Sequence, residues 1–418
     1  MSLSHGFKRT KLACYMAYFT MSSIFCVPPL LFVTLRDTYG ISYTLLGTLV
    51  LTNFCTQMLV DLLFSLFAKK FNAKMLVRVT PLITSLGLAI YALVPWLLPQ
   101  QFAYPGLLLG TIVFSIAAGL SEVMLSPTIA ALPSDNPQRD MSMLHSLYAF
   151  GIFFVIVVST IFFALFGAQN WMYLTLFFAA LPVIAAVLFM LSPMPDLQGA
   201  SEQERATRSK NRTLELALCV ACIFFGSCAE NTMSNWISGY MENALQIPKA
   251  VGDLAGMAAF AILLGLTRIT YAKYGKNIFR MLAVGMVGAA VCYLVVAFAP
   301  GAAPALIACV LTGIFTSMLW PGALIMMEEN IPSVGVAAYA LMASGGDLGA
   351  SVAPQLMGIV TDAVSASALG ARLAETLSLS TEQVGLKAGM LACSAFPILG
   401  IVTLFFTVRF FKKQKAEK

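Results

Sequence analysis

The stretch Gly119-Leu-Ser-Glu-Val-Met-Leu-Ser-Pro127 returns 194 positions later as Gly313-Ile-Phe-Thr-Ser-Met-Leu-Trp-Pro321. Glycine, methionine, leucine and proline stand at the same places in both stretches. The same offset of 194 positions also relates Gly151 to Gly345. This internal repeat predicts a chain built from two halves of one design.

The composition around the repeat indicates a membrane protein. Of the 418 residues, 59% are apolar and only 11% are charged, whereas soluble domains usually carry about 25% charged residues. A soluble protein with this composition would lack the polar side chains that cover a surface in water. A disordered chain would be richer in charge and poorer in apolar residues. We therefore expect the chain to reside in a bilayer.

A helix needs about 20 apolar residues to cross the hydrocarbon core of a bilayer. The sequence offers twelve such stretches, and none alternates as a membrane β-strand does. The predicted fold is all-α, with twelve transmembrane helices in two pseudo-symmetric six-helix halves. The predicted spans are residues 12–35, 43–68, 75–98, 104–132, 141–167, 172–192, 214–241, 251–272, 278–299, 305–330, 335–362 and 386–408.

The longest charged polar stretch, Ser192–Arg212, separates the sixth predicted span from the seventh. It predicts an N-terminal six-helix half at residues 1–192, a cytoplasmic linker at 193–213 and a C-terminal six-helix half at 214–418.

The longest exterior segment lies before the last span. Its residues 368–377 predict a short amphipathic surface helix. Ser380-Thr-Glu-Gln383 predicts a capping box that opens the last helix.

The basic residues indicate the orientation in the membrane. With the N-terminus inside, the exterior loops keep only Arg36, Lys249, Arg372 and Lys387, and the other loop bases gather on the cytoplasmic side. This asymmetry predicts that both termini are cytoplasmic, as in a multi-pass protein of the bacterial inner membrane. The net charge of +6 then reflects topology and anionic lipid, and it does not indicate a nucleic-acid partner.

Four acids fall inside predicted spans, namely Asp61, Glu122, Glu230 and Asp347. A charge at the bilayer centre costs roughly 2.5–3.5 kcal/mol on insertion scales, so these side chains are expected to face the bundle interior or a wet cavity. We expect Glu122 and Asp347 to bind the coupled proton. Asp61 lies close to a helix end and is expected to act in structure or gating, paired with a base such as Arg78.

Polar and aromatic side chains accompany these acids. Carboxylate and amide groups suit the hydroxyl groups of a sugar, and an indole face packs on the apolar side of a pyranose ring. The alternative for each is a hydrogen bond between helices. The residues that we expect to line a solute site are Asn53, Gln57, Glu230, Asn231, Asn235, Trp236 and Trp320.

These motifs resemble the fucose/glucose–galactose:proton symporter branch of the major facilitator superfamily, and the resemblance covers most of the chain. It implies the twelve-helix fold of that superfamily and symport of a sugar with a proton. The matching positions are Gly119, Leu120, Glu122, Pro127, Leu132, Arg139, Leu144 and Gly151 around spans 4 and 5, Phe225, Gly226, Glu230, Trp236 and Tyr240 in span 7, Ser317–Pro321 in span 10, and Gly345, Gly346, Pro354, Gly358 and Asp362 in span 11.

The sequence also departs from that pattern. Ser126 stands where the family usually has asparagine, and span 1 has no central carboxylate. Asp347 is an additional acid, and Lys69 takes the acidic place in the loop after span 2. The missing acid in span 1 keeps an uncoupled sugar uniporter open as an alternative.

A further set of residues is expected to act in structure or gating. Glycines and prolines of spans 4 and 10 would let these helices bend. Arg268 would extend toward the interface or pair with a carboxylate, and His145 would form a hydrogen bond at a helix end. The full set is Asp61, Gly119, Pro127, Arg139, His145, Arg268, Gly313, Pro321, Gly345 and Gly346.

Several kinds of chemistry are not expected. Cys219-x-x-Cys222 lies in an apolar run with no second pair and no nearby histidine, so it predicts helix packing instead of a zinc or redox site. No Gly-x-x-x-x-Gly-Lys-Ser/Thr motif occurs, which argues against an ATP-driven pump. We expect no enzyme, no metal and no cofactor.

The sequence therefore predicts a secondary active transporter, a monomer whose partners are a small solute, a proton and the lipid bilayer. The solute would be neutral and hydroxylated, most simply a sugar. Besides the uniporter, the alternatives are a proton-coupled exporter of drugs or metabolites, for which 30 Phe and 22 Met would form adaptable apolar walls, and a receptor.

Overall fold

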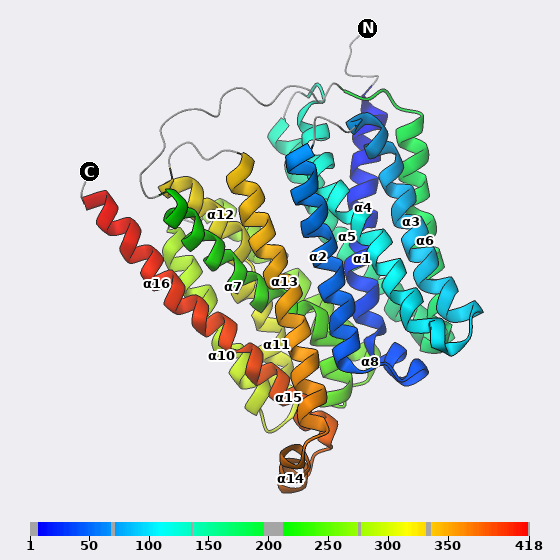
Figure 1. Ribbon diagram of the computed structural model, residues 1–418, viewed down its shortest axis with the longest axis vertical. Coiled ribbons are helices and arrows are strands. Elements are labelled where there is room, and N and C mark those ends of the chain that lie inside the picture. The colour runs from blue at the N-terminus through cyan, green and yellow to red at the C-terminus, as the bar shows by residue number, and fades with distance from the viewer. Residues whose placement is uncertain are drawn as a thin grey trace. The chain divides into compact units, whose positions relative to one another are not determined.

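A computed structural model shows a chain of helices (Figure 1). It describes residues 7–67, 72–134, 137–195, 212–274, 277–331 and 336–416. Within these residues no β-strand is present. Residues 196–211 of the predicted linker lie outside them.

The chain divides into two compact units. Unit 1 comprises Met1–Ile41 and Thr52–Ser201, and unit 2 comprises Ser42–Leu51 and Glu202–Lys418. The boundary therefore cuts through a single helix, α2 (Tyr43–Phe67), whose first residues belong to unit 2.

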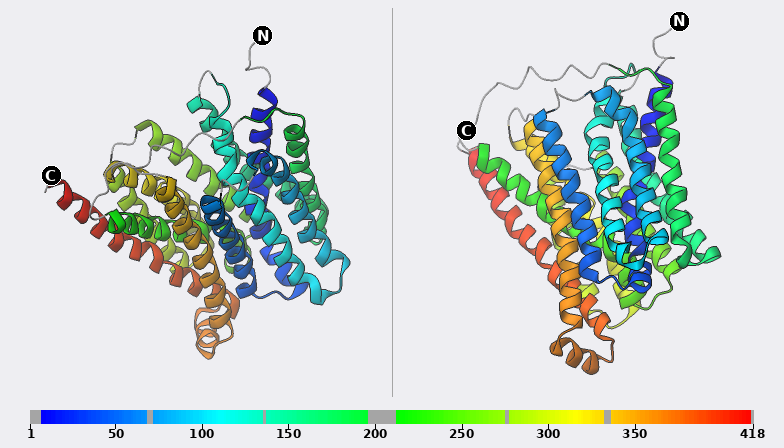
Figure 2. Two further views of the ribbon diagram at one scale, coloured as in Figure 1. Left: turned by 45° about the horizontal axis from the view of Figure 1, so that its top comes forward. Right: turned by 45° about the vertical axis from the view of Figure 1, so that its right-hand side comes forward.

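In unit 1, α3 packs against α4 and α6, and α1 packs against α5 and α6 (Figures 1 and 2). Besides most of α2, unit 1 contains α1 (Lys8–Tyr39), α3 (Ala73–Leu97), η3 (Gln100–Phe102), α4 (Ala103–Ala130), α5 (Pro137–Phe166), η4 (Ala168–Asn170) and α6 (Trp171–Met190).

In unit 2, α7 packs against α13, α16 and α12, and α13 packs against α15. The chain passes from α7 through two π-helical turns, η5 and η6, before it enters α9. The helices of unit 2 are α7 (Arg212–Gly239), η5 (Tyr240–Ala244), α8 (Lys249–Val251), η6 (Gly252–Ala258), α9 (Ala259–Tyr274), α10 (Ile278–Phe298), α11 (Ala302–Thr316), α12 (Leu319–Asn330), α13 (Val336–Ser365), α14 (Ala368–Leu377), α15 (Thr381–Cys393) and α16 (Ala395–Ala416).

Ten segments within the described residues are long and apolar enough to cross a bilayer. Leu341–Ser365 and Ala368–Leu377, which meet at a bend of 80°, add an eleventh only if the bent pair forms one span. In α5, the run whose side chains are all described, Phe150–Phe166, is a shorter apolar helix. The all-helical membrane fold is confirmed, whereas the count of twelve spans and the cytoplasmic termini stay predictions.

The repeated glycines make close helix contacts. A Cβ on Gly119 would lie 2.9 Å from Cβ of Val60 in α2, and one on Gly313 would lie 2.4 Å from the backbone oxygen of Phe260 in α9. Both positions therefore bring a neighbouring helix close, as small residues do in membrane bundles.

The two copies of the repeat differ in continuity. The helix α4 runs unbroken to Ala130, whereas its counterpart ends at Thr316 and restarts at Leu319. The gap at Ser317 and Met318 leaves backbone groups without partners from a regular helix, and neighbouring side chains must satisfy them.

The segment before the last span agrees with its prediction. Residues Ala368–Leu377 form α14, a short helix that meets α13 at the bend. Ser380 caps α15, and its hydroxyl accepts from the Gln383 backbone N–H while the Gln383 side chain accepts from the Ser380 backbone N–H. The capping box is confirmed.

Gly358→Ala is expected to destabilise unit 2. A Cβ at this position would lie 2.3 Å from the backbone oxygen of Tyr43, where α13 meets the first turn of α2. Relieving such a clash typically costs about 1–3 kcal/mol. Thermal unfolding of the detergent-purified protein would measure the loss. The matched control is Gly265→Ala, because no atom lies within 4 Å of a Cβ there; equal unfolding temperatures for the two variants would contradict the contact.

Candidate functional site

An ion pair joins helices α7 and α9 of unit 2. Arg268 of α9 donates from Nη2 to both carboxylate oxygens of Glu230 in α7, at 2.9 and 3.2 Å. The Glu230 side chain is 16% exposed and that of Arg268 is 39% exposed. The sequence predicts that Arg268 either extends toward the interface or pairs with a carboxylate, and the structure shows the pairing.

The same arginine satisfies the break in the α11–α12 span. Its Nε donates to the backbone oxygen of Ser317 at 2.8 Å. One guanidinium group thus joins α9, α7 and the interrupted span. These bonds use only some of the five N–H donors of Arg268, whose side chain is partly exposed.

Amide side chains continue along α7 from Glu230. Asn231 donates to the backbone oxygen and the hydroxyl group of Ser227, at 3.2 and 3.1 Å. Asn235 donates to the backbone oxygen of Asn231 at 2.8 Å. Trp236 is fully buried, and its indole N–H donates to the Pro354 backbone oxygen at 3.1 Å. In this conformation Trp236 supports α13, while Asn231 remains partly exposed.

The glycine pair of α13 receives an aromatic side chain. A Cβ on Gly346 would lie 2.3 Å from the Trp320 ring of α12, and a Cβ on Gly345 would lie 2.6 Å from Val220 of α7. Asp347 follows at once and is buried. The glycines therefore let α12 and α7 approach the backbone beside this acid.

Unit 1 contains a buried polar stripe on α2. Asn53 and Gln57 are both buried, and Gln57 donates to Oδ1 of Asn53 at 2.9 Å. Ser115 of α4 donates to the same oxygen at 2.7 Å. The stripe therefore links α2 to α4, and Ser115 is a member that sequence analysis missed. Ser115 precedes Glu122 by seven residues, which is about two helical turns, so their shared face of α4 could have identified it from the sequence.

Two acids interact at the end of this stripe. Asp61 lies one turn beyond Gln57 and is buried, while the Glu122 side chain of α4 is exposed. The two carboxyl groups are close enough to interact electrostatically. Within the described part of the chain, Oδ1 of Asp61 has no hydrogen-bond partner, and no lysine or arginine forms an ion pair with either acid.

Arg78 does not pair with Asp61. Its Nη2 donates instead to the backbone oxygen of Ser192, at 3.2 Å. This contact holds α3 against the end of α6. The suggested Asp61–Arg78 pair is therefore wrong for this conformation, and the reason is that a free backbone oxygen at the helix end lies within reach of the guanidinium.

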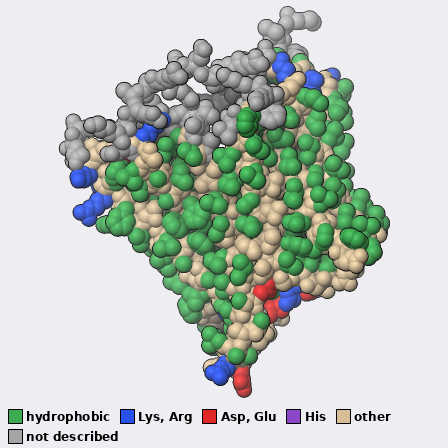
Figure 3. Space-filling model, in the orientation of Figure 1, with side chains coloured by type: hydrophobic (Ala, Val, Ile, Leu, Met, Phe, Trp, Pro, Cys, Tyr) green, Lys and Arg blue, Asp and Glu red, His purple; other side chains and the backbone are tan. Residues whose placement is uncertain are grey.

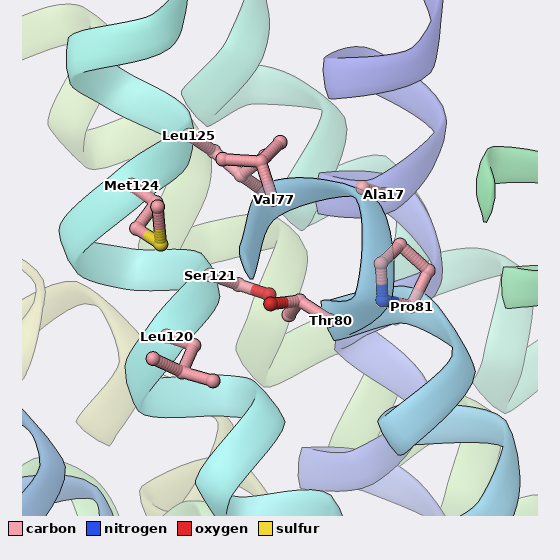
Figure 4. A pocket seen from close by; sticks show the side chains of 8 residues that line it. All are labelled: Ala17, Val77, Thr80, Pro81, Leu120, Ser121, Met124 and Leu125. Carbon is pink, nitrogen blue, oxygen red and sulfur yellow. The ribbon is translucent and has the colours of Figure 1, made fainter. Parts of the chain in front are cut away.

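A gap in the helix bundle of unit 1 is tightly packed. It lies between α1, α3 and α4, and the side chains of Ser121 and Thr80 face each other across it (Figure 4). It holds no room for a water-sized molecule. This gap is therefore helix packing, and a solute needs a different conformation to enter here.

The N-terminal segment of unit 1 carries its own ion pair. Lys11 of α1 pairs with Asp140 at the start of α5, and Ser134 also donates to this carboxylate at 2.6 Å. Burial acts to raise the pKa of Asp140, but the hydrogen bonds from Lys11 and Ser134 outweigh it and hold the pKa below its usual value. The side chains of Pro127, Arg139 and His145 lie outside those that the structure describes.

A second polar cluster surrounds the start of α2 in unit 2. The backbone N–H groups of Tyr43 and Thr44 donate to the Asp362 carboxylate of α13, at 3.2 and 2.6 Å. The Tyr43 hydroxyl donates to Glu382, and Asn243 donates to the Tyr43 hydroxyl at 2.8 Å. Asp362 therefore caps a helix 318 residues away in sequence.

Asp362→Ala is expected to loosen the start of α2. The carboxylate satisfies two N–H groups of a helix N-terminus, and losing such a cap costs about 1–2 kcal/mol. Hydrogen exchange at residues 43–51 would report the loss as faster exchange. Glu375→Ala on the exposed face of α14 is the matched control and should leave this exchange unchanged. Unaltered protection in the Asp362 variant would show that the cap is dispensable.

Another charged group, at the end of α7, was not predicted from the sequence. Lys249 lies 3.4 Å from Asp253 and 3.7 Å from Glu242, and Ser238 donates to Asp253 at 2.5 Å. The spacing of four residues between Lys249 and Asp253 was a signal for an ion pair on one helical face. This group joins the end of α7 to the π-helical turns before α9.

The family comparison agrees with this architecture. The sequence model of the Major Facilitator Superfamily matches residues 12–354. The chain belongs to the major facilitator superfamily. It is accordingly a membrane transporter and not an enzyme, as sequence analysis predicted. No curated protein sequence matches the chain.

Solved structures share the superfamily fold. A bacterial homologue of the human lysosomal transporter Spinster, inward-facing and occupied, superposes with a TM-score of 0.77 at 14% identity, over 99% of this chain and 98% of that one. A D-xylose–proton symporter gives 0.75 at 14% identity, over 96% and 97%. The fucose:proton symporter of E. coli gives 0.57 at 14% identity, over 97% and 99%. At these identities the likeness shows the fold alone.

Proposed function

We propose that this transporter moves a neutral hydroxylated solute, a sugar, together with a proton. The observation that carries the coupling is the pair of acids in unit 1, Asp61 and Glu122, which interact without a nearby cation among the described residues. Two carboxylates that share a site repel each other when both are ionised, so such a pair favours holding a proton.

Glu122 is the member of the pair that exchanges the proton. Its side chain is exposed, whereas that of Asp61 is buried. Proton transfer requires access to water or to a hydrogen-bonded carrier, and we assign this role to the more exposed of the two carboxyl groups.

The solute contacts come from unit 2. Arg268 has more N–H donors than its bonds to Glu230 and Ser317 use, and Asn231 and Trp320 of the same unit are partly exposed. Donors, amide groups and an aromatic ring together match the hydroxyl groups and the apolar face of a sugar. The fold shared with a D-xylose–proton symporter and a fucose:proton symporter is consistent with this substrate class.

Uptake into proteoliposomes tests the proposal. A panel of labelled monosaccharides would be offered with and without an inward proton gradient. Accumulation of one sugar only when the gradient is present supports proton symport. Equal uptake in both conditions would show an uncoupled uniporter. Gradient-driven efflux of a fluorescent dye that no monosaccharide inhibits would show an exporter.

A further inference from the structure

A groove runs between α10 and α16 of unit 2. It encloses about 410 Å³, which lies in the range of small-molecule binding sites. Leu404 forms a buried floor, and exposed Phe405 stands at the side. The groove is lined by Asn277, Phe279, Arg280, Ala283, Ile401, Leu404, Phe405, Val408 and Lys412.

The groove is polar at one end and apolar along its length. Asn277 and Arg280 stand at the start of α10, and Lys412 stands near the end of α16, so the polar residues of both helices meet at the same end of the groove. Ala283 and Ile401 lie farther along their helices, away from that end. Such a groove matches a molecule with a charged head and an apolar tail.

The charge at the polar end is positive. None of the residues that line the groove is acidic, and no acid lies in the first turn of α10. Arg280 stands in that first turn, where the helix dipole already favours an anion. Lys and Arg side chains gather at the C-terminal end of α16 (Figure 3). An anionic head group would compensate these charges.

The walls beside the groove face lipid. The helices α10 and α16 expose large apolar side chains along the same stretch, and on membrane-spanning helices such a surface is expected to contact hydrocarbon. The exposed residues include Val284, Val287 and Val291 of α10, and Ile398, Val402 and Phe406 of α16. The groove therefore opens toward acyl chains, which favours a lipid over a free anion from water.

We propose that this groove binds one anionic phospholipid, whose phosphate contacts Arg280 and Lys412 and whose acyl chain lies along Ala283, Ile401 and Leu404. Basic pockets between membrane helices bind acidic head groups in this manner. The lipid joins α10 to α16 from outside the bundle. This site is separate from the solute contacts of Arg268 and does not depend on the proposed function.

Native mass spectrometry of the full-length protein in neutral detergent tests the proposal. Phosphatidylglycerol and phosphatidylcholine with identical acyl chains would be added at equal concentrations. We expect one phosphatidylglycerol to remain bound, with much lower occupancy by phosphatidylcholine. The double substitution of Arg280→Gln with Lys412→Gln should weaken this binding roughly 30-fold, because each interfacial cation contributes roughly fivefold. Arg372→Gln on α14 is the control for loss of a charge elsewhere and should leave binding unchanged.

A second variant tests the groove itself. Ala283→Trp fills the groove while both cations remain, and it should abolish retention of phosphatidylglycerol. Val291→Trp, on the exposed face of α10 outside the groove, is its control. Retention by the Ala283 variant, or unchanged binding by the double variant, would overturn the proposal. Displacement of the lipid by millimolar inorganic phosphate would show a site for anions from water and would also overturn it.

Discussion

Glu122→Gln is expected to abolish accumulation of solute against its gradient while it leaves exchange of solute across the membrane intact. The glutamine side chain keeps the size and polarity of the carboxyl group but does not take up a proton at neutral pH. Symport of one proton with one solute lets a gradient of one pH unit support about tenfold accumulation. In the variant this ratio should fall to about one.

Counterflow provides the second half of this test. Proteoliposomes loaded with unlabelled solute exchange it for labelled solute without net proton movement, so the Glu122 variant should still exchange. Glu375→Gln makes the same chemical change on an exposed surface helix and should preserve both activities. Full accumulation by the Glu122 variant would contradict the assignment. Accumulation that is lost only in Asp61→Asn would place the exchangeable proton on the buried acid.

Arg268→Gln is expected to reduce both transport and stability. The substitution leaves Glu230 inside the membrane without its cation and leaves the Ser317 backbone oxygen without its donor. Breaking a buried pair costs 3–5 kcal/mol, whereas exposed pairs contribute at most about 1 kcal/mol. Since this pair is partly exposed, we expect a loss of about 2 kcal/mol in stability, measured by thermal unfolding, and a marked fall in the initial rate of uptake.

The double variant Glu230→Gln with Arg268→Gln separates structure from function. Two glutamines restore neutrality and can hydrogen-bond, so stability should largely recover. Transport should not recover if the guanidinium group also contacts the solute. Recovered uptake in the double variant would show that the pair only stabilises the fold. Tighter solute binding in Glu230→Gln alone would instead indicate an anionic solute, which competes with Glu230 for the arginine.

The sequence correctly predicted those parts of the fold that depend on residues close together in the chain. The capping box at Ser380 and the helix Ala368–Leu377 depend on residues within a few positions of one another, and both were found in the sequence.

Contacts between residues far apart in the chain could not be predicted from the sequence patterns. Glu230 and Arg268 were both identified, but their pairing across 38 residues depends on how α7 packs beside α9. The cap that Asp362 provides to α2 depends on a contact 318 residues away. The break at Ser317 also has no local signal beyond Gly313 and Pro321, because α4 carries the same glycine and proline and continues through them.

The ion pair of unit 2 has an electrical consequence. Glu230 and Arg268 neutralise each other, so any movement of this pair through the membrane carries no net charge. For the proposed symport of a neutral solute, the proton is the only net charge transferred in a complete cycle, because the charges of the protein return to their starting positions. A membrane potential of 100 mV contributes about 2.3 kcal/mol per charge. An interior-negative potential should therefore drive uptake even without a pH difference, and the transport current should equal one elementary charge per solute molecule.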